Sequence, residues 1–313
     1  MAKVEKGKES KVTNVNRDQE QYKRRRNEAL KHVDIVKMFM NEPYQLTDKI
    51  TIYQPTIGEI IKFGDHGQYG EKEFYSSINV FVSNTTSYRL QLWDMGIDWN
   101  KITDFELFTM LLGTLNDDVQ RMLFGDVNLK KLKPYAVTKP QQEQTEGEGN
   151  PDGNGGTQGD DGSEKKPEKP KDVKPEFTLY DPETQVEINE ETYIKMASYI
   201  RVMFNIFPKV ERAKGKSTKE DLIREERDKL SMNKDKDSHS MLFPMISACL
   251  NSPGFKYKRD ELKQLGIVEF MDSVQRLQVI NNADALTHAA LGGFADLSKV
   301  DKEEMNFMRD MYT

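Results

Sequence analysis

The chain has 313 residues and a formal net charge of −6, with 31% charged and 36% apolar residues. A chain of this length holds about one to three domains, and its negative charge argues against a protein that coats nucleic acid with its whole surface. The one cysteine, Cys249, excludes an internal disulfide framework and a cysteine-rich zinc site. No apolar run reaches the ~18 residues of a membrane span, and the charged N-terminus lacks the apolar core of a signal peptide. We therefore expect a protein that works in a reducing cytoplasm.

The N-terminal 31 residues form a basic tail, with ten Lys or Arg and five Asp or Glu residues. Almost no apolar residue precedes Leu30, so we expect disorder that gives way to a helix over Asp18–Asn41, ended by Pro43. The apolar anchors expected in that helix are Leu30, Val33, Met38 and Phe39.

A run of four cations in this tail is the candidate nucleic-acid element, because phosphate binding requires several cations on one face. Glu20 and Glu28 flank the run, and Tyr22 is the only aromatic residue near it that could stack on a base. A solvated helix end is therefore the favoured interpretation, and nucleic-acid binding is kept as an alternative. The four residues are Lys23, Arg24, Arg25 and Arg26.

The next region, residues 32–138, predicts a strand followed by short helices. Alternation over Thr47–Tyr53 places Ile50 and Ile52 on one face of a strand. A helix is expected over Glu71–Val82 from the spacing of its apolar residues. Two capping boxes, Thr56 with Glu59 and Thr103 with Glu106, mark the starts of two further helices, and Gly64 is expected to end the first.

Residues 139–176 form an insert rich in Gly, Pro, Glu, Gln, Lys and Asp, a composition that predicts disorder. A strand is predicted on each side of it, at Lys133–Thr138 and at Phe177–Tyr180, and the second begins a hairpin around Asp181-Pro182. Because long surface insertions have a small entropic cost, we favour a loop between neighbouring strands. A linker between two domains stays open as the alternative.

The region 177–313 is expected to be mainly helical. Asn189 predicts the N-cap of a helix with a broad apolar face, and Ser217 with Glu220 predicts a third capping box before a mostly charged helix. Met241–Leu250 is strongly apolar, and Asp301 predicts the N-cap of a last helix.

The best-defined unit is Phe255–Ile280. Gly266 is expected to close a short turn in the left-handed conformation, and a second helix starts directly after it. The apolar face of that helix is expected to pack mostly inside the molecule, and any exposed part of it would contact a partner. Together with two methionines of the last helix, the candidate partner-binding residues are Phe270, Met271, Val274, Leu277, Met305 and Met308.

Catalytic chemistry has little support in the sequence. The four histidines show no metal-binding or triad spacing, and no cofactor motif is present. Asp65, His66 and Glu71 stand beside the glycines of GDHGQYG, which we interpret as a helix end and a loop. Cys249 has no basic neighbour that would stabilise a thiolate, so a buried apolar role is expected. We therefore expect a protein that is not an enzyme and has no cofactor.

The predicted fold is α+β, mainly helical with a small antiparallel β component and a long disordered insert. The expected divisions are the basic tail (1–31), an N-terminal α+β region (32–138), the insert (139–176) and a mainly helical C-terminal region (177–313).

Several stretches together resemble tail morphogenesis proteins of tailed phages of Gram-positive bacteria, which are taken for tail assembly chaperones or minor tail components. The stretches are ITIYQPTIGEIIKFGDHGQYGEKEFYSSI, DWNKITDFELF, NEETYIKMASYIRVMF, LGIVEFMDSVQRL and DLSKVDKEEMNFMRDM. The resemblance implies a non-enzymatic assembly protein of the host cytoplasm, with no catalytic residues, that binds apolar helices of a tape-measure-like protein or tail subunits.

Two alternatives to the chaperone remain at this point. The first is a structural component of the virion, in the tail or the head–tail connector, and the second is a nucleic-acid-binding protein that uses the basic tail. Self-association also stays open, whereas a membrane partner is not expected.

Overall fold

A computed structural model describes residues 18–63, 70–136, 177–233, 240–293 and 300–311. These residues form helices and two small antiparallel sheets, so the predicted mainly helical α+β class is confirmed. The predicted disordered insert, residues 139–176, lies outside the described residues.

The helices in the first half of the chain are α2 (Ile35–Phe39), α3 (Ile57–Lys62), α4 (Gly70–Val82), α5 (Arg89–Asp94), α6 (Asp104–Leu111) and α7 (Asp117–Phe124), with 3-10 turns η2 (Leu112–Thr114) and η3 (Leu129–Lys131). Those in the second half are α8 (Glu190–Phe204), α9 (Lys216–Asn233), α10 (Leu242–Asn251), α11 (Arg259–Leu262), α12 (Ile267–Leu291) and η5 (Lys302–Met305).

The predicted single strand over Thr47–Tyr53 is wrong, because the chain turns within it. The structure has a hairpin of β1 (Tyr44–Thr47) and β2 (Ile50–Ile52). The Thr47 hydroxyl accepts hydrogen bonds from the backbone N of Lys49 (3.3 Å) and of Ile50 (3.1 Å), which is the local turn chemistry of threonine. Ile50 and Ile52 are both fully buried, so their predicted common face is confirmed.

The strands on the two sides of residues 137–176 pair directly with each other. β3 (Lys133–Ala136) is antiparallel to β4 (Phe177–Asp181), which in turn pairs with β5 (Val186–Ile188). The predicted hairpin and its neighbouring strand are thus confirmed. The two ends of the undescribed segment therefore leave and rejoin one sheet, as a loop insertion requires.

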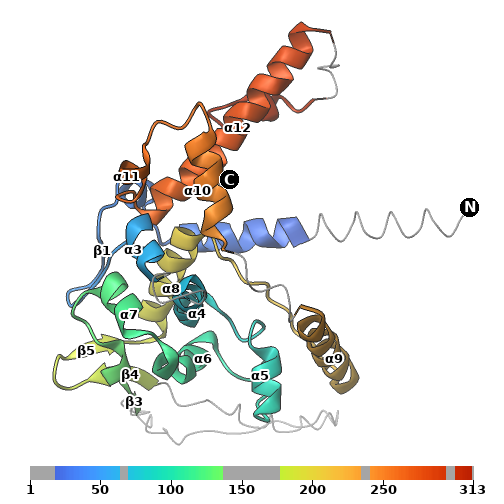
Figure 1. Cartoon of the computed structure of the whole chain (residues 1–313). Coiled ribbons are helices and arrows are strands. Elements are labelled where there is room, and N and C mark those ends of the chain that lie inside the picture. Colours follow the sequence, from blue (N-terminus) through green and yellow to red (C-terminus); the bar gives the residue numbers. More distant parts are fainter. Residues whose placement is uncertain (1–17, 64–69, 137–176, 234–239, 294–299, 312–313) are drawn as a thin grey trace, which may run out of the picture.

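The main core is built around α4 and α8, which pack against each other near the middle of the molecule (Figure 1). Aromatic rings from several elements meet there: Phe105 stacks on Phe177 of β4 with centroids 5.0 Å apart, and Phe108 lies 5.0 Å from Tyr193. The predicted apolar face of α8 is confirmed, with Met196 and Ile200 fully buried.

A second, smaller core holds α9 beside α5, away from the α4–α8 pair (Figure 1). Its buried members include Trp99 and Ile223. Polar contacts fasten α9 as well. Arg89 pairs with Glu226 of α9 and, at 2.6 Å, with Glu211, and Lys219 of α9 contacts Asp98 at 2.6 Å.

Most of the predicted helix caps are confirmed. Both predicted boxes at Thr56 and Thr103 are present, and the Asn189 side chain accepts from the backbone N of Thr192 at 2.8 Å. The predicted box at Ser217 is wrong, because the backbone N of Lys219 already donates to the Gly215 carbonyl and the helix has begun before Ser217. Gly64, expected to end α3, lies outside the described residues.

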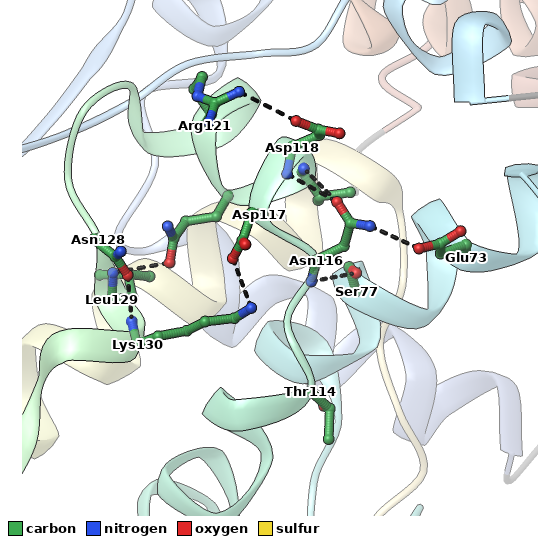
Figure 2. A network of polar contacts seen from close by, with 12 residues as sticks. Glu73, Ser77, Thr114, Asn116, Asp117, Asp118, Arg121, Asn128, Leu129 and Lys130 are labelled. Atoms are coloured by element: carbon green, nitrogen blue, oxygen red, sulfur yellow. Dashed lines mark hydrogen bonds and ion pairs between the residues drawn. The ribbon is translucent and has the colours of Figure 1, made fainter. Parts of the chain in front are cut away.

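The junction between α4 and α7 is tied by a polar network that Figure 2 shows from close by. Asn116 caps α7 by accepting from two backbone N–H groups, while its own side-chain N–H donates to Glu73 of α4 at 2.7 Å. The backbone N of Asn116 donates to the Ser77 hydroxyl at 3.1 Å, and Lys130 reaches Asp117 at 2.6 Å. One asparagine therefore caps one helix and fixes it to another.

The predicted N-terminal helix over Asp18–Asn41 is wrong as a single helix. Described residues 18–30 are helical, the chain turns at residues 31–34, and Asp34 starts α2 by accepting from the backbone N of Val36 and of Lys37. A side chain that caps a helix start competes with helix continuation at the same place. Of the expected anchors, Met38 is buried, Leu30 and Val33 are half-buried, and Phe39 is exposed.

Gly266 does not adopt the predicted left-handed conformation. Its φ is −63° and its ψ is 151°, and it serves as the N-cap of α12. The cause is tertiary, since Gly266 forms a β-bridge with Thr56 and the next backbone N, of Ile267, donates to the Pro55 carbonyl. The last predicted helix is only the 3-10 turn η5, although its predicted N-cap, Asp301, is confirmed.

Candidate partner-binding groove

A groove of about 710 Å³ lies between α10, α11 and the end of α3. Its apolar side chains include Phe243, Ile246 and Leu250 from α10 and Ile61 from α3. Phe243 is 69% exposed and Ile61 is 41% exposed, while the other two are half-buried. Side chains of this size that remain open to solvent next to one another are typical of a surface that binds another protein. We call it the α10–α11 groove.

Three cations stand along the same groove. Lys258, Arg259 and Lys263 line it and are exposed. Within the described residues, Lys263 forms an ion pair with Asp260 at 3.3 Å, and Lys258 and Arg259 form none. An apolar floor with a basic edge selects a ligand that is apolar on one face and carries carboxylates beside that face.

The position of α10 depends on a carboxylate from a distant part of the sequence. Glu71, in the first turn of α4, accepts from the backbone N of Met241 at 2.8 Å and of Leu242 at 3.0 Å, and from the Ser240 hydroxyl at 2.5 Å. These bonds satisfy N–H groups that every helix start leaves without an intrahelical partner, and the negative charge suits the positive end of the helix dipole. The sequence offered Glu71 as a catalytic residue type, and the structure gives it this capping role.

Backbone contacts hold α11 against α3. The backbone N of Gly58 donates to the Lys263 carbonyl at 2.8 Å, and that of Ile57 donates to the Leu265 carbonyl at 2.9 Å. A Cβ on Gly58 would lie 2.8 Å from the Lys263 carbonyl oxygen, so the close approach requires glycine. The basic edge of the groove is thus fixed relative to its apolar floor.

Tyr257 connects the groove to α12. Its hydroxyl donates to Glu269 at 2.5 Å, and that hydrogen bond, together with burial, raises the pKa of the Tyr257 phenol. The ring also packs edge-on against Phe255, with centroids 5.6 Å apart. The segment leading into α11 is therefore held at both aromatic residues.

The predicted partner-binding face of α12 is mostly used inside the molecule. Phe270 is fully buried in the main core, and Met271, Val274 and Leu277 are half-buried and pack against it, with α10 beside α12 (Figure 1). Among the six predicted partner-binding residues, Met308 alone is highly exposed, at 74%, while Met305 is half-buried.

The predicted basic cluster is divided by its helix. Lys23 and Arg24 are exposed, whereas Arg25 and Arg26 are half-buried, and Arg26 donates to the Met311 carbonyl. Burial lowers the pKa of Arg25. The helix itself is docked, since the Tyr22 hydroxyl donates to Asn205 at 3.0 Å. The four cations therefore do not present one continuous face to phosphates.

The described part of the chain brings together no group of three or more His, Cys, Asp or Glu side chains that could hold a metal ion. Cys249 is buried in α10, and this burial raises the pKa of its thiol, as expected for an apolar role. His32 lies in the turn before α2 and His288 lies near the end of α12, while Asp65, His66 and His239 lie outside the described residues. None of the described helices has both the length and the apolar character that crossing a bilayer demands.

Comparison with known protein families, curated proteins and solved structures gives no match in any of the three. The α10–α11 groove is therefore interpreted from its own chemistry.

Sequence reasoning did not find this groove. The sequence shows that Met241–Leu250 is strongly apolar, but not that this segment lies beside Ile61 and α11. The one available signal was that α10 is apolar around most of its circumference, since Phe243, Ile246 and Leu250 follow at helical spacing in addition to buried Leu242 and Cys249.

Proposed function

We propose that the chain is a non-enzymatic phage tail assembly protein, a chaperone that binds an apolar helix of a tape-measure-like protein or tail subunit in the host cytoplasm. The observation that carries the proposal is the α10–α11 groove, with exposed Phe243 and Ile61 beside three exposed cations. The resemblance of five sequence stretches to tail morphogenesis proteins supplies the biological setting.

The ligand that suits this groove is an amphipathic helix with carboxylates along the edge of its apolar face. Such a helix places residues spaced by three and four positions into a groove of a folded partner. Burying one large apolar side chain contributes about 1.5–3 kcal/mol, so two or three such anchors give reversible binding after the costs of association. Reversible binding is what a chaperone requires, because it must release the tail protein when assembly proceeds.

Co-expression of the chain with the tape-measure protein of the same phage, followed by pull-down, tests this proposal. We expect the wild-type chain to retain the tape-measure protein. Phe243→Glu and Arg259→Glu should each reduce that retention at least about tenfold, because the first disrupts the apolar floor of the groove and the second its basic edge. Met232→Glu is the matched control, since Met232 is 77% exposed on α9. No retention by the wild-type chain, or equal retention by all four proteins, would overturn the proposal.

A chaperone and a virion subunit differ in where the protein ends up. Mass spectrometry of purified particles should find no stoichiometric amount of this chain if it leaves the tail on assembly. Its presence at a fixed copy number would favour a structural role in the tail or connector.

A further inference from the structure

We infer that the α10–α11 groove is occupied, when no tail partner is present, by the C-terminal segment 301–311 of a second copy of this chain. This inference rests on the proposed function in one respect, that the groove is a protein-binding site. It adds the identity of a competing occupant and therefore a way in which the site is regulated.

The segment has the chemistry that the groove selects. Phe307 is 53% exposed and Met308 is 74% exposed, so two large apolar side chains stand next to each other in solvent. Exposed carboxylates of Asp301, Glu303 and Glu304 precede them. This combination of an apolar pair with neighbouring negative charge complements the exposed aromatic floor and the basic edge of the groove.

The backbone of the segment is already ordered in the shape that presents these side chains. Arg276 of α12 donates to the carbonyls of Phe307 at 2.8 Å and of Arg309 at 3.0 Å. The Asn306 side chain accepts from the backbone N of Met308 at 3.0 Å. Since the carbonyls face the molecule's own α12 while the Phe307 and Met308 side chains remain exposed, little further ordering is needed on binding.

The occupant of the groove comes from another copy. No residue of 301–311 lines the groove of its own chain, because the segment is held on α12 by Arg276 and at Met311 by Arg26. Two different patches that meet between copies form a head-to-tail contact, which continues into an open chain of subunits or closes into a ring. The groove volume of about 710 Å³ lies within the ~300–1,000 Å³ of binding clefts, so it has room for both side chains.

Self-association and partner binding then compete for one site. At high concentration the chain covers its own apolar grooves, and a tail protein that binds the groove more tightly separates the copies by mass action. Self-association should weaken at high ionic strength, because salt screens the exposed ion pairs between the segment and the groove.

The test is the molar mass of the full chain in solution over a wide concentration range, by light scattering after gel filtration and by sedimentation. We expect the wild-type mass to rise with concentration and to fall on addition of salt. Met308→Glu and Arg259→Glu should each weaken association at least about tenfold. Arg259→Glu places a negative charge beside the carboxylates of the segment, and Met308→Glu places a desolvated charge against the apolar floor of the groove. Met232→Glu should behave as wild type, and unchanged melting curves would show that the variants are folded.

Mixing the two variants gives a sharper result. Met308→Glu keeps an intact groove and Arg259→Glu keeps an intact segment, so their mixture should form a one-to-one dimer and nothing larger. A wild-type chain that stays monomeric at every concentration, or an association that neither substitution weakens, would overturn the inference. If the inference fails in this way, retention of the tape-measure protein by Met308→Glu would still support the proposed function. If the wild-type chain self-associates as expected but does not retain the tape-measure protein, the proposed function fails and the inference stands.

Discussion

The Glu71 carboxylate accepts a hydrogen bond from the backbone N of Leu242 at 3.0 Å, and thereby fixes the start of α10 to the first turn of α4 across 171 positions of sequence. The same oxygen also accepts from the backbone N of Met241. α10 carries three of the apolar side chains of the α10–α11 groove. The geometry of the groove therefore depends on a residue that does not line it.

Replacing Glu71 by alanine should loosen α10. The substitution leaves the N–H groups of Met241 and Leu242 without their acceptor, and loss of a helix cap of this kind costs about 0.5–2 kcal/mol. Urea unfolding measures that loss, and the thiol of Cys249 gives a local readout, because Cys249 is 1% exposed within α10 and reacts only when the helix opens. We expect faster labelling of Cys249 in Glu71→Ala.

Glu225→Ala is the matched control for this substitution, since Glu225 is exposed on α9 and far from α10 in the fold (Figure 1). It should leave the free energy of unfolding and the labelling rate unchanged. Equal labelling rates in Glu71→Ala and the wild-type chain would show that the capping contacts do not hold α10 in place.

The contrast between Glu71 and the capping boxes explains what the sequence could predict. Thr56 with Glu59 satisfies its own helix start within four residues, so its pattern is visible in the sequence. Glu71 does the same for a helix that begins at Leu242, and no local pattern records that contact. The hairpin at Thr47 and the extended Gly266 were missed for related reasons, a threonine side-chain turn in one case and a bridge to Thr56 in the other.

The candidate site shows the same limit. The groove combines residues from separate parts of the sequence, since Ile61, Phe243 and Arg259 meet only in the tertiary structure. As expected, most of the apolar face of α12 packs inside the molecule, where Phe270 is fully buried in the main core. Amphipathic spacing identifies an apolar face but does not tell whether that face meets its own chain or another.

Gly58→Ala should destabilise the junction of α3 and α11. The added Cβ would lie 2.8 Å from the Lys263 carbonyl oxygen and 3.3 Å from the Lys263 Cβ, so the backbone must shift. Overpacking of this kind costs about 1–3 kcal/mol. Thermal or urea unfolding measures the loss, and binding to the groove should weaken with it because Lys263 moves.

Gly113→Ala provides the comparison. A Cβ at Gly113 meets no atom within 4 Å, so that substitution should be neutral or should stabilise the fold by reducing the entropy of the unfolded chain. If both glycine substitutions had the same effect on stability, the close approach at Gly58 would not be the cause.

Arg89→Met should release α9 from the body while leaving the main core intact. The Arg89 side chain is 10% exposed and pairs with Glu211 and Glu226, whose side chains are 36% and 24% exposed. Removing one partner of a fully buried ion pair costs about 3–5 kcal/mol, and the partial exposure of both carboxylates reduces the expected loss to about 2 kcal/mol. Hydrogen exchange should accelerate over residues 216–233.

Exchange in α8 should stay much slower than in α9 in this variant, because α8 belongs to the main core and opens only in global unfolding. The control is Arg224→Met on the exposed face of α9, where the ion pair with Asp221 is open to solvent. Acceleration in both variants would mean that α9 responds to loss of any positive charge rather than to its anchor.

The attachment of α9 should also weaken in acid. A hydrogen bond from Lys219 is the main cause that holds the pKa of Asp98 below its ordinary value of about 3.9, against a smaller opposing effect of burial. A group whose pKa is lower in the folded state stabilises that state above its unfolded pKa, and this stabilisation is lost as pH falls through the folded pKa. The contribution, on the order of 1 kcal/mol, should therefore be complete at neutral pH and disappear progressively below about pH 4.

Tryptophan fluorescence reports this change directly, because both tryptophans of the chain lie beside the contact. Trp93 and Trp99 pack against each other with centroids 6.0 Å apart, and the Lys219 ammonium lies 5.5 Å from the Trp99 ring centre. Asp98→Asn should abolish the acid-dependent step while the rest of the pH profile stays. An identical acid transition in wild type and Asp98→Asn would show that Asp98 is not the group responsible.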